Sequence, residues 1–159
     1  MIFKGVATAL VTPFTEDDRV DVSALERIVE YQLEGNVDAL VALGTTGEPA
    51  TLSRKEKELV LKTVAKKAKG KIPVIVGAGS NDTKSAIDNC AFAKDNGADA
   101  LLIVTPYYNK CTQEGLVRHF GTIADATSLP ILLYNVPSRT GVNLSLIHIS
   151  EPTRRVVIS

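Results

Sequence analysis

The chain has 159 residues, of which 45% are hydrophobic and 23% are charged, and its 18 Lys and Arg balance its 18 Asp and Glu. This composition is typical of a globular domain large enough to bury a core. The balanced charge argues against a nucleic-acid-binding protein or a membrane-surface helix. The apolar runs are far shorter than the roughly 20 residues that span a bilayer, and the N-terminus lacks a signal-peptide layout. We therefore expect a cytoplasmic protein that binds neither nucleic acid nor membranes.

Cysteine and histidine are too sparse to suggest a metal centre. Cys90 and Cys111 form no CxxC pair, and His119 and His148 have no second ligand at metal-binding spacing. We therefore expect no disulfide framework and no metal site.

Short aliphatic runs that end in turn residues alternate with longer amphipathic segments along the chain. The short runs predict strands and the amphipathic segments predict helices. In chain order these are strand 5–11, helix 22–33, strand 39–43, helix 53–69, strand 73–76, helix 83–96, strand 100–104, helix 113–127 and strand 130–134.

Capping signals accompany the predicted helices. Ser53 and Glu56 have the spacing of a capping box, and Thr83 stands where the third helix should begin. Three glycines follow the three earlier helices where a left-handed C-cap is expected. They are Gly35, Gly70 and Gly97.

The alternation predicts an α/β protein with a parallel sheet covered by helices, either a (β/α)8 TIM barrel or a doubly wound sheet. The first strand is not followed by a glycine-rich phosphate loop, and residues 77–82 lack the third glycine of a dinucleotide-binding turn. Polar residues instead follow each of the five strands, as in a TIM barrel. Because that fold has eight strands and about 250 residues, we expect a TIM barrel truncated after about the fifth strand.

Thr45 and Thr46 lie between two glycines directly after the second predicted strand. One interpretation is a strand-to-helix turn with hydroxyls that cap locally. The other is a small carboxylate site, in which backbone N–H groups and two hydroxyls bind an anion.

Three of the four tyrosines, Tyr107, Tyr108 and Tyr134, stand at predicted strand ends. Each could be a core aromatic with its hydroxyl at the rim, or a general acid or base. Arg139 follows in a proline-bounded loop, where it is either a solvated charge or a clamp for a carboxylate. The residues alone leave these alternatives open.

Four stretches form a set: Gly-Thr-Thr-Gly-Glu at 44–48, Val-Thr-Pro-Tyr-Tyr-Asn at 104–109, Gln-Glu-Gly at 113–115 and Tyr-Asn-Val-Pro-Ser-Arg-Thr-Gly at 134–141. Together they resemble the 4-hydroxy-tetrahydrodipicolinate synthase (dihydrodipicolinate synthase) family, over residues 1 to about 143. The paired threonines and the 135–141 stretch separate this family from relatives such as N-acetylneuraminate lyase.

The resemblance implies an enzyme of lysine and diaminopimelate biosynthesis. Such enzymes condense pyruvate with L-aspartate 4-semialdehyde through a lysine Schiff base, without a metal or organic cofactor, and the family forms homotetramers. The chemistry is coherent, because an imine makes the pyruvate methyl group acidic and a chain of hydroxyls can then move protons.

The resemblance also implies roles for individual residues. Tyr134 would be the proton donor and acceptor, and Thr45 would link it to Tyr108 from a neighbouring subunit. Thr45 and Thr46 would contact the substrate, with Thr46 holding the pyruvate carboxylate. Arg139 would meet the carboxylate of the aldehyde.

A lysine-binding inhibitor cleft is implied at Asn81, Tyr107, Ser85 and Lys57. Ser85 and Lys57 stand where inhibited family members have a Glu and a His. A serine cannot pair with the ammonium group of lysine, and Lys57 repels it. We therefore expect weak feedback inhibition.

The chain departs from the family in one essential residue. The Schiff-base lysine belongs on a sixth strand, and this chain has no lysine after Lys110. We therefore expect the chain itself to be inactive. The alternatives are a related pyruvate lyase of the N-acetylneuraminate lyase type and a non-catalytic fragment.

Residues 144–154 do not resemble the helix expected after the fifth strand, and Pro152 would break one. Their eleven-residue string matches the translation of a transposon-type sequencing adapter. We therefore divide the chain into residues 1–143, the N-terminal part of a TIM-barrel pyruvate-dependent lyase, and residues 144–159, a non-native tail. A natural short paralogue is the alternative.

Overall fold

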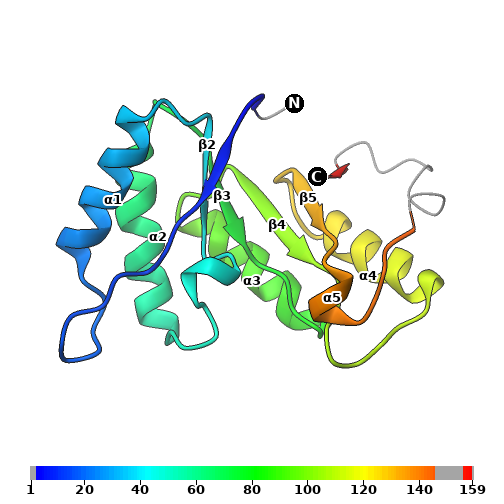
Figure 1. Cartoon of the computed structure of the whole chain (residues 1–159). Helices are drawn as coiled ribbons and strands as arrows, with labels where there is room; N and C mark the ends of the chain where they lie inside the picture. The colour runs from blue at the N-terminus through cyan, green and yellow to red at the C-terminus, as the bar shows by residue number, and fades with distance from the viewer. Residues whose placement is uncertain (1–2, 146–155, 159) are drawn as a thin grey trace. The chain divides into compact units, whose positions relative to one another are not determined.

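The computed structural model describes residues 3–145 and 156–158. The chain divides into two compact units, one of residues 1–77 with 93–100 and the other of residues 78–92 with 101–159. In both units strands and helices alternate along the chain (Figure 1).

The first unit contains three parallel strands. Its elements are β1 (Ala7–Ala9), α1 (Val22–Glu34), β2 (Ala39–Ala42), the 3-10 turn η1 (Thr45–Gly47), α2 (Arg54–Ala68) and β3 (Val74–Gly77). β2 lies between its partners, pairing with β1 on one side and with β3 on the other. The apolar faces of the two helices are buried, with Leu25 and Val64 fully enclosed. Burial of such faces is the main source of stability for short amphipathic helices.

The second unit also contains parallel strands. Its elements are α3 (Thr83–Asp95), β4 (Ala100–Val104), α4 (Gln113–Asp125), β5 (Ile131–Tyr134), α5 (Pro137–Thr140) and β6 (Val156–Ile158), with the end of α3 and the first residue of β4 belonging to the first unit. β5 pairs with β4 and with β6, and Val104 of β4 lies opposite Tyr134 of β5. The polar ends of β4 and β5 therefore meet at one edge of the sheet.

All nine predicted strands and helices are present, and the parallel α/β class is confirmed. β1 is shorter than predicted. Gly5 has a φ of 120°, and the Val6 N–H donates to the Asp38 carboxylate at 2.7 Å instead of to a strand carbonyl. Two elements were not predicted, the short helix α5 and the strand β6. β6 lies within residues 144–159, and the residues that lead to it, 146–155 with His148, lie outside the described residues.

The capping box of α2 is confirmed, because Ser53 and Glu56 each bond to the backbone N–H of the other. α3 begins at Thr83, as predicted, but the side chain that caps it belongs to the preceding residue. Asp82 caps α3 by accepting from the Ser85 N–H at 2.7 Å, and Thr83 is already helical. Hydrogen bonds from the side chain and the backbone N–H of Ser85 lower the pKa of the Asp82 carboxyl.

Two of the three predicted glycine C-caps adopt a left-handed backbone, Gly70 with a φ of 74° and Gly97 with a φ of 94°. The prediction for Gly35 is wrong, because its φ is −72°. The Gly35 N–H still bonds to the Tyr31 carbonyl, so the chain remains helical there. Asn36 takes the left-handed conformation one residue later, with a φ of 54°, as asparagine readily does.

Within the described parts of the chain, none of the helices is long and apolar enough to cross a membrane. Cys90 is buried, and desolvation raises the pKa of its thiol to about 11. A thiol with so high a pKa is a poor nucleophile at neutral pH.

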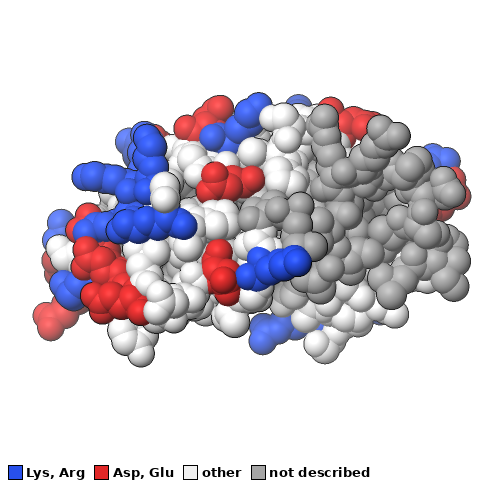
Figure 2. Space-filling view, turned by 90° about the horizontal axis from the view of Figure 1, so that it is seen from above, with Lys and Arg blue, Asp and Glu red and all other residues white. Residues whose placement is uncertain are grey.

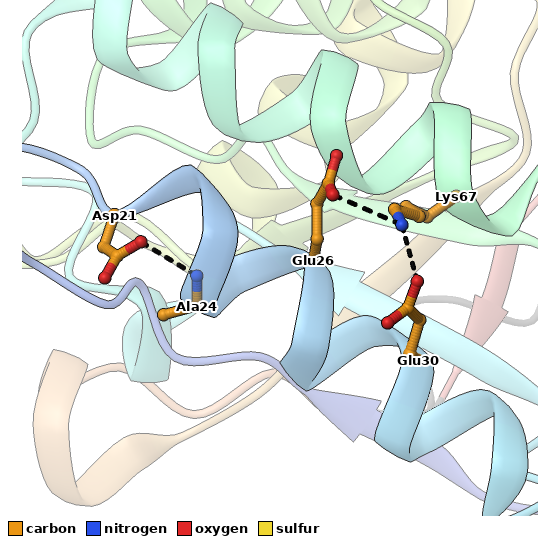
Figure 3. Close-up of polar contacts among 5 residues, drawn as sticks. All are labelled: Asp21, Ala24, Glu26, Glu30 and Lys67. Atoms are coloured by element: carbon orange, nitrogen blue, oxygen red, sulfur yellow. Dashed lines mark hydrogen bonds and ion pairs between the residues drawn. The ribbon is translucent and has the colours of Figure 1, made fainter.

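Basic and acidic side chains lie next to one another on the face shown in Figure 2. Oppositely charged side chains also join α1 to α2 in the first unit. Lys67 of α2 forms ion pairs with Glu26 at 3.3 Å and with Glu30 at 2.5 Å, both on α1 (Figure 3). The Lys67 side chain is 26% exposed. The hydrogen bonds to Glu30 and Glu26 raise the pKa of Lys67, so the lysine remains charged across the neutral range.

A second interhelical contact joins α3 to α4 in the second unit. His119 is 6% exposed, and its Nδ1 lies 2.9 Å from the Thr83 hydroxyl. Its Nε2 is buried without a hydrogen-bond partner among the described residues. Desolvation lowers the pKa of His119, although the Asp82 carboxylate opposes this shift. The imidazole is therefore held in its neutral form.

The ion pairs predict that Lys67→Met lowers the urea midpoint of unfolding, because the aliphatic stem remains but both carboxylates lose their partner. High salt should reduce the difference from the wild type, since partly exposed pairs are screened. Lys62→Met is the matched control, because among the described residues Lys62 pairs only with Glu58 on its own helix. An equal loss in the two variants would show that the contact between α1 and α2 contributes nothing of its own.

The buried His119 predicts a stability that falls with acidification. Its folded-state pKa lies below its unfolded value of about 6.5, so the unfolded chain binds the proton more readily. Stability is full above that unfolded value and declines as pH falls from it toward the folded pKa. Urea unfolding of His119→Asn, which keeps a polar partner for Thr83 but does not titrate, should lack this decline. Superimposable pH profiles for the two proteins would contradict the prediction.

Candidate active site

The paired threonines of the first unit lie on an exposed turn that follows β2. Thr45 and Thr46 form η1 with Gly47, and both threonines are exposed. The Gly47 N–H donates to the Gly44 carbonyl at 2.9 Å. The buried hydroxyl of Thr12 donates to the Gly47 carbonyl at 2.7 Å. The turn thus presents two hydroxyls to solvent from a fixed backbone.

A close backbone approach holds the start of this turn. Leu43 is buried but has a φ of 54°, a conformation that is rare for a bulky residue. Its carbonyl passes so near β3 that a Cβ on Gly77 would lie 2.2 Å from the oxygen. Only glycine permits this approach, so Gly77 is part of what positions Thr45 and Thr46.

The loop after β4 carries two exposed tyrosines in a tight turn. Tyr108 has a φ of 66°, and the Asn109 N–H donates to the Tyr107 carbonyl at 2.8 Å across it. A three-residue turn centred on a left-handed tyrosine is strained, and such strain concentrates at functional sites. The Tyr108 side chain is 91% exposed and that of Tyr107 is 41% exposed. Within this chain, therefore, Tyr108 projects into solvent.

Tyr134 is the last residue of β5 and is half-buried. Its carbonyl accepts from the Thr105 N–H at 3.1 Å, which continues the pairing of β4 with β5 beyond the strand ends. Tyr134 and the loop that carries Tyr107 and Tyr108 therefore leave the same edge of the sheet.

Arg139 lies in the short helix α5 rather than in a loop, which corrects the sequence prediction. Pro137 occupies the first turn, where its missing N–H has no intrahelical partner to lose, and Gly141 ends the helix with a φ of 69°. The Arg139 side chain is exposed and forms no ion pair with any residue that the structure describes. Its guanidinium is available to a carboxylate.

The predicted inhibitor-cleft residues fall in both units. Lys57 is half-buried on α2 in the first unit, whereas Asn81, Ser85 and Tyr107 belong to the second. Gly79, which precedes Asn81, runs so close to β4 that a Cβ there would lie 2.7 Å from the Val104 nitrogen. Asn81 therefore follows a segment that lies against the end of β4.

The second unit thus brings Tyr107, Tyr108, Tyr134 and Arg139 to one edge of its sheet. The implied link from Tyr134 through Thr45 joins residues of different units, and it stays a prediction. Among the residues described, no three His, Cys, Asp or Glu side chains gather as a metal site would require.

The supporting role of several residues in the quoted motifs and strand ends was not predicted from the sequence. They are polar residues whose hydrogen bonds hold the loops, namely Thr12, Thr105, Thr140, Gln113 and Asn135. The available signal was a threonine within an apolar run, as at Val104-Thr105-Pro106, since a buried hydroxyl needs a partner.

Comparison with known proteins identifies relatives along almost the whole chain. The model of the dihydrodipicolinate synthetase family matches residues 2–155. The 4-hydroxy-tetrahydrodipicolinate synthase of Alkaliphilus oremlandii is 52% identical over 143 residues, which make up 90% of this chain and 49% of that protein. That of Methanocaldococcus jannaschii is also 52% identical, over 90% of this chain and 49% of its own length.

Solved structures give the same result. The dihydrodipicolinate synthase of Thermotoga maritima matches with a TM-score of 0.96 and 46% identity, covering 100% of this chain and 55% of that one. The chloride-inhibited enzyme of Acinetobacter baumannii, solved with pyruvate, matches with a TM-score of 0.93 and 47% identity, over 99% of this chain and 55% of that one. The chain spans about half the length of these relatives. It belongs to the dihydrodipicolinate synthetase family, and its fold is that of the corresponding part of the family's TIM barrel.

Proposed function

We propose that residues 1–143 form the N-terminal part of a 4-hydroxy-tetrahydrodipicolinate synthase, which condenses pyruvate with L-aspartate 4-semialdehyde. The observation that carries the proposal is the 52% identity to proteins of that name over 90% of the chain. Their names favour this reaction over that of an N-acetylneuraminate lyase. The structure solved with pyruvate belongs to a relative with 47% identity and supports pyruvate as the first substrate.

Tyr134 acts in this proposal as the proton donor and acceptor. When pyruvate forms an imine with a lysine, a proton leaves its methyl group and the resulting enamine carbon attacks the aldehyde. A phenol can serve such proton transfers when it is held at the reacting atoms. The half-buried place of Tyr134 at the end of β5 suits that role, because its backbone is fixed by the pairing with β4.

Thr45 links Tyr134 to a Tyr108 that comes from a neighbouring subunit of the homotetramer. The 91% exposure of Tyr108 supports this part of the proposal, since the strained turn directs the ring away from its own chain. A residue that completes another subunit's site must project in this way.

The two substrate carboxylates have separate binding groups. Thr46, with Thr45, holds the pyruvate carboxylate through the exposed hydroxyls of η1. Arg139 binds the carboxylate of the aldehyde, and its freedom from other ion pairs with described residues suits this role.

The chain by itself is inactive in this proposal because the imine-forming lysine is missing. Its last lysine, Lys110, lies on the loop after β4, with its Cε 3.0 Å from where a Cβ on Gly141 would stand. An exposed loop lysine does not replace a lysine that a strand would hold in the barrel interior.

Residues 144–159 are a non-native tail in this proposal. Leu144 and Ser145 are held to preceding residues through their backbone N–H groups. Asn135 accepts from the Leu144 N–H at 3.0 Å, and Gln113 accepts from the Ser145 N–H at 3.1 Å. Any residue other than proline can offer these N–H groups, whereas the buried place of the Leu144 side chain favours an apolar residue.

Borohydride trapping tests the proposed function. We expect no covalent pyruvate adduct on this chain, whereas the Alkaliphilus oremlandii relative should gain one. A chimera of residues 1–143 with the C-terminal half of that relative should regain both the adduct and the condensation activity. In the chimera, Tyr134→Phe should lower kcat by about 10²- to 10⁴-fold, the usual contribution of a general acid or base.

Tyr31→Phe is the matched control for the chimera, because Tyr31 is 72% exposed on α1 and should leave the activity unchanged. A chimera that folds but lacks activity would contradict the proposed reaction. Turnover by the Tyr134→Phe chimera within about twofold of the unmodified chimera would contradict the role of Tyr134.

The same chimera tests the inhibitor cleft. We expect free lysine to inhibit it only weakly, because Ser85 offers no charge to the ammonium group and Lys57 repels it. Ser85→Glu combined with Lys57→His should raise its sensitivity to lysine, while Lys55→His, on the exposed surface of α2, should not. Submillimolar inhibition of the unmodified chimera would contradict the expectation.

A further inference from the structure

Thr105 forms hydrogen bonds to two of the structural elements that carry candidate site residues in the second unit, the end of β5 and the helix α5. It follows β4 directly and is fully buried. Its backbone N–H donates to the carbonyl of Tyr134 at 3.1 Å. Its hydroxyl donates to the hydroxyl of Thr140 at 3.1 Å, on the residue after Arg139.

Thr140 is the centre of a buried group of hydrogen bonds that defines α5. Its side chain is 5% exposed, and its oxygen also accepts from the Val142 N–H at 3.3 Å. Its single proton can go to the Val142 carbonyl at 3.0 Å or to the Val136 carbonyl at 3.3 Å. Because that proton is committed to a carbonyl, Thr105 must be the donor in the bond between the two hydroxyls.

Thr105 also begins the loop that leads, through Pro106, into the strained turn that presents Tyr108. A left-handed tyrosine persists only where its surroundings fix the chain on both sides. On the N-terminal side, the two hydrogen bonds of Thr105 supply that restraint. One buried residue is therefore bonded to Tyr134 through its backbone N–H and to the helix of Arg139 through its hydroxyl, and it precedes the turn of Tyr108 in the chain.

We propose that Thr105 is the positioning residue that sets Tyr134, Arg139 and Tyr108 in a fixed geometry at the edge of the β4–β5 sheet. Its backbone N–H holds Tyr134, and its hydroxyl, rather than the bulk of its side chain, anchors it to the helix of Arg139. Valine has nearly the same shape, but it would remove the hydroxyl that donates to the buried Thr140 oxygen and leave that oxygen only the longer bond from the Val142 N–H. Serine keeps the donor. The inference rests on the proposed function only for what these three residues bind.

The test uses the full 159-residue chain, labelled with 3-fluorotyrosine and nitrogen-15, as wild type, Thr105→Val and Thr105→Ser. In Thr105→Val we expect the fluorine resonances of Tyr108 and Tyr134 to shift or broaden, while that of Tyr31 on α1 stays in place. Amide exchange at residues 139–142 should accelerate about 5- to 30-fold, as expected for loss of one buried hydrogen-bond partner. Thr105→Ser should restore the wild-type resonances and exchange.

Thr63→Val is the matched control, because Thr63 is also a buried threonine but, in the part of the chain that the structure describes, its hydroxyl bonds only to the Leu59 carbonyl within α2. It should alter neither the tyrosine resonances of the second unit nor the exchange at residues 139–142. A purely structural role of Thr105 would lower stability without changing the folded-state resonances. Unchanged Tyr108 and Tyr134 resonances in a folded Thr105→Val chain would overturn the proposal.

If Thr105→Val does not fold, Thr140→Val removes the same bond from its other partner. It should accelerate exchange at residues 139–142 and shift the Tyr134 resonance, and wild-type behaviour of that variant would overturn the proposal. None of these measurements needs a substrate. An inactive chimera would therefore contradict the proposed reaction alone. A folded Thr105→Val chain with unchanged tyrosine resonances would contradict the positioning role alone.

Discussion

Parallel pairing of strands is the constraint on which the candidate site depends. The chain must return to the same end of the sheet after each strand, so the carboxyl ends of neighbouring strands lie at one edge. In the second unit, the register that places Val104 opposite Tyr134 brings the loops after β4 and β5 together. In the first unit, the same arrangement places the loop after β1 beside the turn after β2, where the Thr12 hydroxyl reaches the Gly47 carbonyl.

The two units hold their exposed loops by the same physical device. In each, a buried threonine beyond a strand end donates its hydroxyl to the next loop, Thr12 to the Gly47 carbonyl and Thr105 to the Thr140 hydroxyl. A short β-branched side chain loses little conformational freedom on burial. A satisfied buried hydrogen bond also costs a great deal to break, because each freed partner is left desolvated.

The sequence predicted the elements of this fold well because apolar periodicity reports burial directly. It predicted the types and strand-end positions of Thr45, Tyr108 and Tyr134, since polar residues at the ends of apolar strands stand out. It did not predict α5, whose four residues are too few to show periodicity. The strain at Tyr108 also escaped prediction, because a positive φ at tyrosine follows from tertiary contacts and opposes local preference.

The residues proposed to carry the chemistry are mostly exposed, and the residues that hold them in place are buried. The two groups therefore contribute differently to function and to folding. Thr45, Thr46, Tyr108 and Arg139 are exposed, so their side chains contribute little to folding. Thr12, Thr105 and Thr140 are buried, and their hydroxyls are hydrogen-bonded. Loss of an exposed side chain would remove its own chemistry while the backbone stays in place. Loss of a buried hydroxyl would instead leave its hydrogen-bond partner desolvated inside the protein and loosen the segment that the bond holds. The geometry of the candidate site therefore depends mainly on the buried residues, and its chemistry on the exposed ones.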